Sequence, residues 1–230
     1  MSSWGNHSVS PDPSPWSAPR TSASRSPDPF PWSAGADERL RRWLLDLLDT
    51  PGLTAIRDPD EARRALLEDA LRAVSVVREN DGPIVDVGSG GGTPGLPLAA
   101  AFPSRSVTLL ESSRRKCEFL RRVAREFPNV EVVNGRAEEQ RLDRYGVALA
   151  KALAHPPVAA EWCLPLVRPG GVAILWVGPS ADTGAVSRAA AHVGGVPADG
   201  RDGLLVLRKL VPTPAGFPRR PGIARKRPLR

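Results

Sequence analysis

A run of glycines follows an acid at the end of a short apolar stretch, and this run carries the clearest chemical signal in the chain. The stretch reads IVDVGSGGGTPG from Ile84 to Gly95. Isoleucine and valine before the turn are typical of a buried parallel strand. The glycines leave no side chain between the backbone and a ligand that lies on the turn. The pattern predicts a strand at residues 84–87, followed by a turn that a ligand can approach closely.

Two ligand classes fit this turn, and the first is a dinucleotide. Gly90, Gly92 and Gly95 have the spacing of a dinucleotide site between strand and helix, with Glu111 available for a ribose. This interpretation would make the protein a nicotinamide oxidoreductase. It is disfavoured by Asp86, by the proline at the start of the following helix and by the lack of an evident acid or base for hydride transfer.

The second register places the acid inside the end of the strand and three glycines at alternate positions after it. Its members are Asp86, Gly88, Gly90 and Gly92. This register resembles the pattern of class I S-adenosylmethionine methyltransferases, in which the loop holds the methionine portion of the cofactor. We favour it over the dinucleotide register. A glycine-rich turn that binds nothing is a further alternative, but so many glycines and prolines would weaken the fold without providing a binding site.

Four segments after the turn resemble, in order and spacing, the ribosomal RNA small-subunit methyltransferase G family. They read GGTPGLPLA, VTLLES, NGRAEE and EWCLPLVRPGG, beginning at Gly91, Val107, Asn134 and Glu161. The likeness runs from about Leu53 to a closing FPRRPGIARKRPLR. It implies a class I, Rossmann-like α/β fold with a mostly parallel sheet and N-terminal helices. It also implies N7-methylation of a guanine in 16S rRNA, with S-adenosylmethionine as the cofactor.

The resemblance implies a set of cofactor-binding residues. They are Asp86, Gly88, Gly90, Gly92, Leu96, Glu111, Arg136, Ala137, Glu138 and Lys151. Glu111 ends a strand, where a carboxylate can accept hydrogen bonds from both ribose hydroxyls; the alternative is a neighbour of a helix N-cap. Ala137 and Glu138 would flank the adenine, although Glu138 also suits the charged start of a short helix.

Arg136 and Lys151 are the candidate catalytic residues. Arg136 matches an active-site arginine of the family, although a surface salt bridge would also account for it. Lys151 stands in Ala-Lys-Ala where the family has Ser-Arg-Ala, which keeps a cation and loses the bidentate fork. Further departures from the family pattern are Gly52, Leu66 and Val177. We take the rRNA methyltransferase as the hypothesis. A paralogue with another acceptor and a non-catalytic protein that binds S-adenosylmethionine or RNA stay open.

The implied reaction makes small demands on side chains. Guanine N7 carries an in-plane lone pair and no proton, so no general base need act before it attacks the methyl group. Catalysis then depends on alignment and on a pocket that accepts the purine as it gains positive charge. The guanine must leave its stack, so RNA loops and single strands are the expected substrate. The few histidines and the cysteines Cys117 and Cys163 suggest no metal site, and we expect both thiols to be core or half-buried and reduced.

Strand and helix patterns alternate along the chain, which predicts a parallel sheet covered on both faces. We place the strands at 84–87, 106–111, 130–134, 145–150, 171–177 and 203–210. We place the helices between them at 94–101, 112–127, 156–167 and 181–193. Ligands in such sheets lie at the carboxyl ends of the strands. The candidate residues fall at these ends.

The first 36 residues have a different composition from the rest. They contain ten serines and seven prolines, and PDPSPWSA returns in them as PDPFPWSA. Such a segment has too few aliphatic residues to form a core, so we expect a disordered extension without a catalytic role. The repeat is either a duplicated linear motif or a chance duplication.

Helices are predicted between this extension and the first strand, within residues 37–80. The first has Asp37 as its N-cap and an apolar face that includes Trp43. The second covers residues 58–79. In the family, such helices pack on the cofactor-binding domain and help to close the site. We therefore expect a single methyltransferase domain whose parts are the helices at 37–80 and a Rossmann-like core at 84–211, together 37–211.

The positive charge of the chain lies at its C-terminal end. Residues 208–230 hold eight of the 32 basic residues and no acid. We expect residues 212–230 to form a basic tail whose prolines keep it extended across the RNA or the domain surface. The cations of residues 208–230, Lys209 among them, would contact phosphates of 16S rRNA in the small ribosomal subunit, and a solvated basic end is the plain alternative. We expect cofactor binding to be independent of this tail.

No apolar run approaches the roughly 20 residues that a membrane span needs. The start of the chain also lacks a hydrophobic signal core. We therefore expect no membrane contact, a cytoplasmic location and a monomer.

Overall fold

The sheet that organises this protein is built from parallel strands with an antiparallel edge. The structure is a computed structural model that describes residues 32–198, 200 and 203–229. Its strands are β1 (Ile84–Val87), β2 (Val107–Glu111), β3 (Val130–Asn134), β4 (Tyr145–Lys151), β5 (Val167–Trp176), β6 (Gly195–Ala198) and β7 (Leu204–Lys209). Within the described residues these form one seven-stranded sheet in the order β3-β2-β1-β4-β5-β7-β6. Strands β1 to β5 pair in parallel, and β7 runs antiparallel to β5 and β6.

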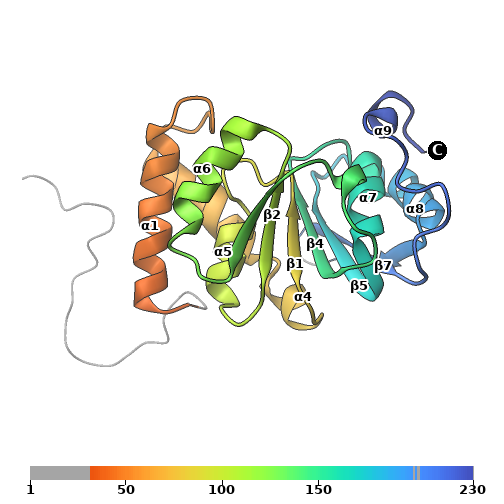
Figure 1. Ribbon diagram of the computed structural model, residues 1–230, viewed down its shortest axis with the longest axis horizontal. Helices are drawn as coiled ribbons and strands as arrows, with labels where there is room; N and C mark the ends of the chain where they lie inside the picture. Colours follow the sequence, from red (N-terminus) through yellow and green to blue (C-terminus); the bar gives the residue numbers. More distant parts are fainter. Residues whose placement is uncertain (1–31, 199, 201–202, 230) are drawn as a thin grey trace, which may run out of the picture.

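Helices cover both faces of this sheet (Figure 1). On one side lie α1 (Ala34–Asp49), α5 (Gly95–Ala101) and α6 (Arg114–Ala124), and on the other lie α7 (Pro156–Cys163) and α8 (Thr183–His192). The shorter segments are α2 (Pro59–Ala62), the π-helical η1 (Arg63–Glu68), α3 (Asp69–Leu71), α4 (Val74–Arg78), the 3-10 turns η2 (Ala137–Glu139) and η3 (Leu164–Leu166), and α9 (Ile223–Lys226). None of the helices in the described part of the chain is long and apolar enough to cross a membrane. The layers confirm the predicted α/β fold class.

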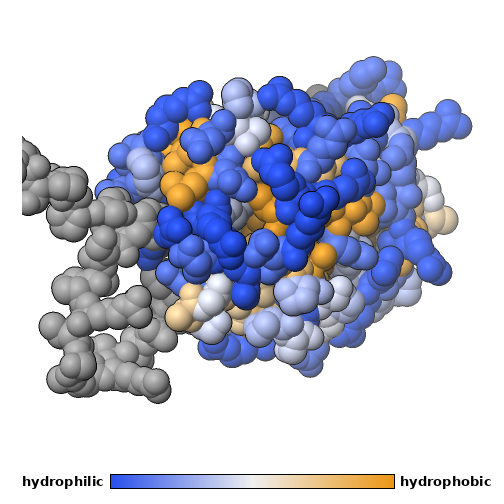
Figure 2. All heavy atoms as spheres, turned by 60° about the vertical axis from the view of Figure 1, so that its left-hand side comes forward, coloured by the Kyte–Doolittle hydropathy of each residue, from blue (hydrophilic) through white to orange (hydrophobic). Residues whose placement is uncertain are grey.

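Two apolar cores flank the sheet because side chains alternate from face to face along each strand. Ile84 packs with helix α1 in one core, and Val85 packs with helix α7 in the other. The central strands β1 and β2 are therefore buried along their whole length, and most of their residues are apolar. The outer surface is different. Figure 2 turns the left-hand side of Figure 1 forward. It shows a face that is largely hydrophilic, with smaller hydrophobic patches among the hydrophilic residues.

All the predicted strands form, with the largest shift in boundary at β5. This strand begins at Val167 instead of residue 171, so helix α7 ends at Cys163 instead of residue 167. The edge strand β6 is not predicted by the sequence pattern. Its four residues, GVPA, include a glycine and a proline, which weaken a strand signal and are tolerated at a sheet edge.

Helix α1 begins earlier than the sequence predicts. Its N-cap is Ser33, whose Oγ accepts a backbone hydrogen bond at 3.3 Å. The predicted cap, Asp37, and the predicted end of the extension are therefore wrong. The reason is Trp32, which is buried in the core beside α1 and donates from Nε1 to an Asp37 oxygen at 3.3 Å. The disorder predicted for residues 1–31 lies outside the described residues.

The helix predicted over residues 58–79 forms in pieces. Asp58 caps its start by accepting a hydrogen bond from the Glu61 N–H at 2.7 Å, and Pro59 occupies the first turn as predicted. The middle of the segment is the π-helical η1. Such turns recur at functional sites, and two backbone carbonyls of η1 accept hydrogen bonds from side chains at the carboxyl ends of the strands.

The chain after β7 folds back onto the domain beside α7 and ends in the short helix α9 (Figure 1). Lys209, at the end of β7, is completely buried. Its Nζ donates to Leu164 O at 3.0 Å and Val193 O at 2.9 Å, and it lies 3.5 Å from Asp143 Oδ1. Burial lowers the pKa of Lys209, and the nearby Asp143 carboxylate opposes that shift. Lys209 is therefore a structural cation, and its prediction as an RNA phosphate contact is wrong.

Candidate functional site

The glycine turn after β1 has a backbone that few other residues adopt. Gly88 and Gly90 have φ values of +73° and +56°, in the left-handed region. A Cβ at Gly90 would meet only Gly88 O, at 3.8 Å, so the space beside the turn is open. Gly95 is required by packing, because a Cβ there would lie 2.7 Å from Asp86 Oδ2 and 2.3 Å from Leu109 Cδ2. The turn thus holds α5 tightly against β1.

Helix α1 supports the turn from behind. Trp43 Nε1 donates to Gly91 O at 2.7 Å, and a Cβ at Gly91 would lie 2.5 Å from Leu47 Cδ1. Leu96 is fully buried, and its Cδ1 would lie 2.6 Å from a Cβ at Gly92. The N-terminal helix therefore packs on the domain that carries the turn, as expected. Leu96 lies in the core beneath the turn.

Asp86 lies beneath the turn and orders it. Its side chain is 1% exposed, and Oδ2 accepts a hydrogen bond from the Gly95 N–H at 3.0 Å. Ser89 Oγ donates to the Asp86 backbone carbonyl at 2.8 Å. Burial raises the pKa of Asp86 to about 7, and the Glu111 carboxylate adds to that shift. The acid at the end of the strand thus fixes the start of α5.

Glu111 joins the glycine turn to the loop after β2. Its Oε2 accepts from the Gly90 N–H at 3.0 Å, and its Oε1 accepts from the Ser113 N–H at 2.7 Å. The side chain is 6% exposed. Ser112 Oγ also donates to Oε1, at 3.5 Å, so the free acceptor position is on Oε2. This carboxylate is therefore held rigidly at the carboxyl ends of β1 and β2, with acceptor capacity to spare.

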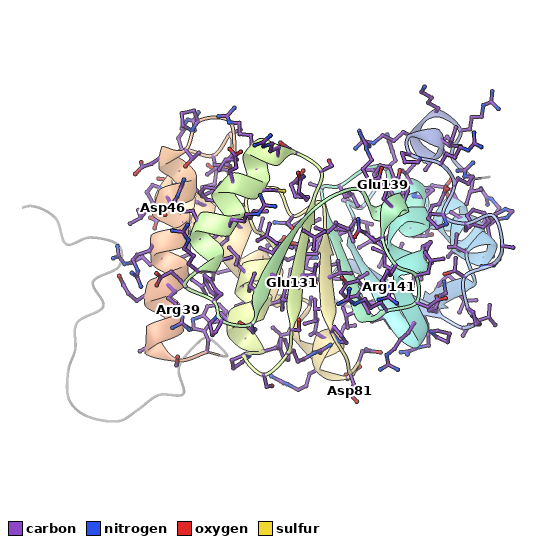
Figure 3. The ribbon with its side chains drawn as sticks, viewed as in Figure 1. Arg39, Asp46, Asp81, Glu131, Glu139 and Arg141 are labelled. Carbon is purple, nitrogen blue, oxygen red and sulfur yellow. The ribbon has the colours of Figure 1, made fainter. Side chains whose placement is uncertain are left out.

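A pocket of about 180 Å³ opens at this end of the sheet. It is lined by Val87, Gly88, Leu110, Ser112, Gly135, Arg136, Ala137, Glu138, Leu153, Trp162 and Arg225. Four of the sequence-predicted residues are among them, namely Gly88 and the three consecutive residues from Arg136 to Glu138. The predicted residues outside the lining are Asp86, Gly90, Gly92, Leu96, Glu111 and Lys151. Figure 3 shows Glu139, in the same η2 turn, near the carboxyl ends of the strands, whereas Asp81 lies at the opposite end.

The η2 turn presents three different side chains to this pocket. Arg136 is exposed, and its guanidinium has no ion-pair partner among the residues that the structure describes. The surface salt bridge considered for it from the sequence is therefore not seen. Ala137 is small and 7% exposed. Glu138 does begin a short helical turn, and its Oε1 accepts a hydrogen bond from the Gly222 N–H at 3.3 Å.

Lys151 ends β4 and points to the N-terminal helices. Its Nζ lies 3.0 Å from Asp69 Oδ2 and donates to the Ala65 carbonyl in η1. Burial alone would raise the pKa of Asp69, but hydrogen bonds from Arg72 and Lys151 outweigh it and lower that pKa. Lys151 is 17% exposed. The cation at this position is therefore fixed by an ion pair that the sequence does not predict.

Seven of the eleven lining residues are not in the predicted set, and three of these lie after β4: Leu153, Trp162 and Arg225. The guanidinium carbon of Arg225 lies 5.1 Å from the centroid of the Trp162 ring, and Arg225 Nη2 donates to Leu153 O at 3.4 Å. Trp162 and Arg225 belong to segments that carry the family resemblance, EWCLPLVRPGG and the closing basic tail. No local signal indicates that these segments meet.

The cysteines are buried and apart from this pocket, as predicted for core thiols. Burial raises the pKa of the Cys163 thiol well above its ordinary range. Within the described residues, no three His, Cys, Asp or Glu side chains come together in a way that could hold a metal ion.

The parallel sheet with its antiparallel β7, together with the acid and glycines after β1, has the architecture of class I S-adenosylmethionine-dependent methyltransferases. One solved member of similar fold is the 16S rRNA N2 G1207 methyltransferase of T. thermophilus, in complex with AdoMet and guanosine. The likeness has a TM-score of 0.51 at 21% sequence identity, and covers 72% of this chain and 42% of that one.

The sequence comparisons narrow the class to a family. The family model described as rRNA small subunit methyltransferase G matches residues 38–192. The ribosomal RNA small subunit methyltransferase G of Synechococcus elongatus is 38% identical over 198 residues, which are 77% of this chain and 82% of the relative. That of Chloroflexus aggregans is 35% identical over 212 residues, covering 83% and 89%. This chain belongs to the rRNA small subunit methyltransferase G family.

Proposed function

We propose that this protein transfers a methyl group from S-adenosylmethionine to N7 of a guanine in 16S rRNA. The observation that carries the proposal is membership of the rRNA small subunit methyltransferase G family over residues 38–192. The pocket at the carboxyl ends of β1 to β3 supports it, because ligands of such sheets bind at these ends.

The residues around the pocket fit S-adenosylmethionine. Glu111 is a buried carboxylate with spare acceptor capacity beside the open turn at Gly90, which suits the ribose hydroxyls and the methionine portion. Ala137 leaves room for a flat ring, and the Trp162 indole N–H is buried without a hydrogen-bond partner among the residues that the structure describes. When bound, the cofactor supplies a methyl group on a positively charged sulfur. In this proposal, Ala137 and Glu138 flank its adenine.

The side chains need only align the acceptor. Guanine N7 has a free in-plane lone pair, so the reaction requires position and a stable environment for the positive charge that develops on the purine. Arg136 is exposed at the pocket and unpaired within the described residues, which leaves it available to the RNA. Lys151 is a fixed cation beside η1, and we assign it to the acceptor side of the site.

The partner in this proposal is the small ribosomal subunit, met in the cytoplasm. Exposed cations of the tail, Arg220, Lys226 and Arg227, are available for RNA phosphates.

The test is methyl transfer in vitro. Small-subunit particles that lack the modification are incubated with the protein and labelled S-adenosylmethionine, and the rRNA is digested and analysed for 7-methylguanosine by mass spectrometry. Gly90→Val should abolish transfer, because valine is strained at φ +56°. The matched control is Gly178→Ala, at a glycine whose Cβ would meet no atom within 4 Å.

Two results would overturn the proposal. A label on a different nucleotide, or on no rRNA despite cofactor binding, would indicate a paralogue with another acceptor. If calorimetry shows binding of NADH but no binding of S-adenosylmethionine or its demethylated product, the glycine turn is a dinucleotide-binding turn and the proposal is wrong.

A further inference from the structure

The C-terminal tail is anchored to the domain by a buried ion pair. Arg219 Nε and Nη2 donate to the two carboxylate oxygens of Glu161, each at 2.5 Å. Glu161 lies in α7 and is 1% exposed. The hydrogen bond to Glu161 raises the pKa of Arg219, which keeps the guanidinium charged. A two-pronged pair of this kind fixes the direction of the chain that follows.

Beyond this anchor, the tail contacts three segments that contribute residues to the pocket: η2, the loop after β4 and α7. The Gly222 N–H donates to Glu138 in η2, at 3.3 Å, and Arg225 Nη2 donates to Leu153 O in the loop after β4. Ala224 is 2% exposed, within the same core as α7. The tail therefore forms part of the pocket wall, in contrast to a tail that serves RNA alone.

Trp162 is the side chain that this wall covers. It is 7% exposed, it is one of the residues that line the pocket, and Arg225 lies over its ring with the guanidinium carbon 5.1 Å from the ring centroid. Its Nε1 has no hydrogen-bond partner in the described part of the chain. Buried donors without a partner are rare in folded proteins. An unpartnered donor on a ring that lines a pocket points to a ligand that brings an acceptor.

We propose that Trp162 and Arg225 bind the adenine end of S-adenosylmethionine, so that the basic tail retains the cofactor. The inference rests on the proposed function, in which Ala137 and Glu138 flank the adenine on the same side of the pocket. Adenine offers ring nitrogens that accept hydrogen bonds and a flat π surface on which a guanidinium stacks. These features match an unpartnered indole N–H and an arginine held over the pocket wall.

The test is calorimetric titration of the full chain with S-adenosylhomocysteine and, separately, with adenosine. Arg225→Ala should weaken both ligands by roughly 3- to 30-fold, the range of cation–π contacts from exposed to desolvated sites. Trp162→Phe keeps a ring and removes the donor, and should weaken both by roughly 2- to 12-fold, as for one net hydrogen bond. Lys226→Ala and Arg227→Ala are matched controls, because both cations are exposed in the same segment and do not line the pocket. Neither control should change the dissociation constants.

The outcomes separate this inference from the proposed function. Wild-type protein that binds neither S-adenosylhomocysteine nor S-adenosylmethionine would refute the proposed function. Wild-type binding with unchanged affinity in Arg225→Ala and Trp162→Phe would refute the role of the tail and leave the proposed function intact. A loss with S-adenosylhomocysteine but not with adenosine would also overturn the inference, because the contact would then not be to adenine. Far-UV circular dichroism and thermal unfolding confirm that each variant is folded.

Discussion

Replacing Arg219 with methionine should destabilise the protein by leaving a buried carboxylate without its partner. Glu161 is 1% exposed, and the two hydrogen bonds from Arg219 are the ones that its oxygens accept from described residues. Removing one member of a buried ion pair costs about 3–5 kcal/mol in the free energy of unfolding. In a chain of this size, that loss lowers the melting temperature by roughly 6–20 °C. Methionine is used because it keeps most of the length of the arginine stem.

The tail can reduce this loss by detaching, since water would then reach Glu161. We therefore expect faster amide hydrogen exchange in residues 212–229 of Arg219→Met, together with a lower melting temperature. The double variant Arg219→Met/Glu161→Leu should recover most of the stability, because no buried charge is left. Arg220→Met is the matched control, at an exposed neighbour that makes no ion pair in the described part of the chain. If Arg219→Met and Arg220→Met have equal stability and equal exchange, the tail is not docked through Glu161.

Three further predictions follow from the site. Asp86 has a folded-state pKa of about 7, above its ordinary 3.8, so its contribution to stability is complete below about pH 4 and is lost as the pH rises through 7. The loss is roughly 4 kcal/mol at most, and urea unfolding from pH 4 to 8 should show it in the wild type but not in Asp86→Asn. Lys151→Ala should abolish single-turnover methyl transfer with little change in cofactor affinity, whereas Lys151→Arg should be tolerated. An unchanged rate in Lys151→Ala would show that Lys151 has a structural role and none in methyl transfer. Replacing three exposed tail cations with alanine should reduce the slope of log affinity for RNA against log salt by about 2, and Arg78→Ala, at the opposite end of the sheet, should not change it. The three are Arg220, Lys226 and Arg227.

The sequence predicts the parts of the fold that local chemistry determines. The strand, turn and helix from Ile84 onward follow from apolar residues, a strand-end acid and glycines, and the structure has all three. The start of α1 is misplaced because Ser33 and Asp37 are both good N-caps, and burial of Trp32 decides between them. Helix propensity alone therefore cannot show which of the two residues caps α1.

The candidate site also contains residues that local sequence predicts and residues that only the tertiary fold brings together. Ala137 and Glu138 can be placed at the pocket because they follow a strand whose carboxyl end is fixed by the sheet. Trp162 and Arg225 are far apart in the chain, and they meet where the tail is paired to α7 through Arg219 and Glu161. A basic, proline-containing tail suggests RNA binding from its composition alone, and only the folded path of the chain shows that two of its arginines are engaged with the domain.

Mass mapping of 16S rRNA from cells with and without this gene tests the proposed function most directly. We expect one guanine that carries an N7-methyl group when the gene is present and loses it when the gene is deleted. Restoring the wild-type gene should restore the mark, and restoring Gly90→Val should not. An identical pattern of 7-methylguanosine in the two strains would contradict the assignment of 16S rRNA as the substrate.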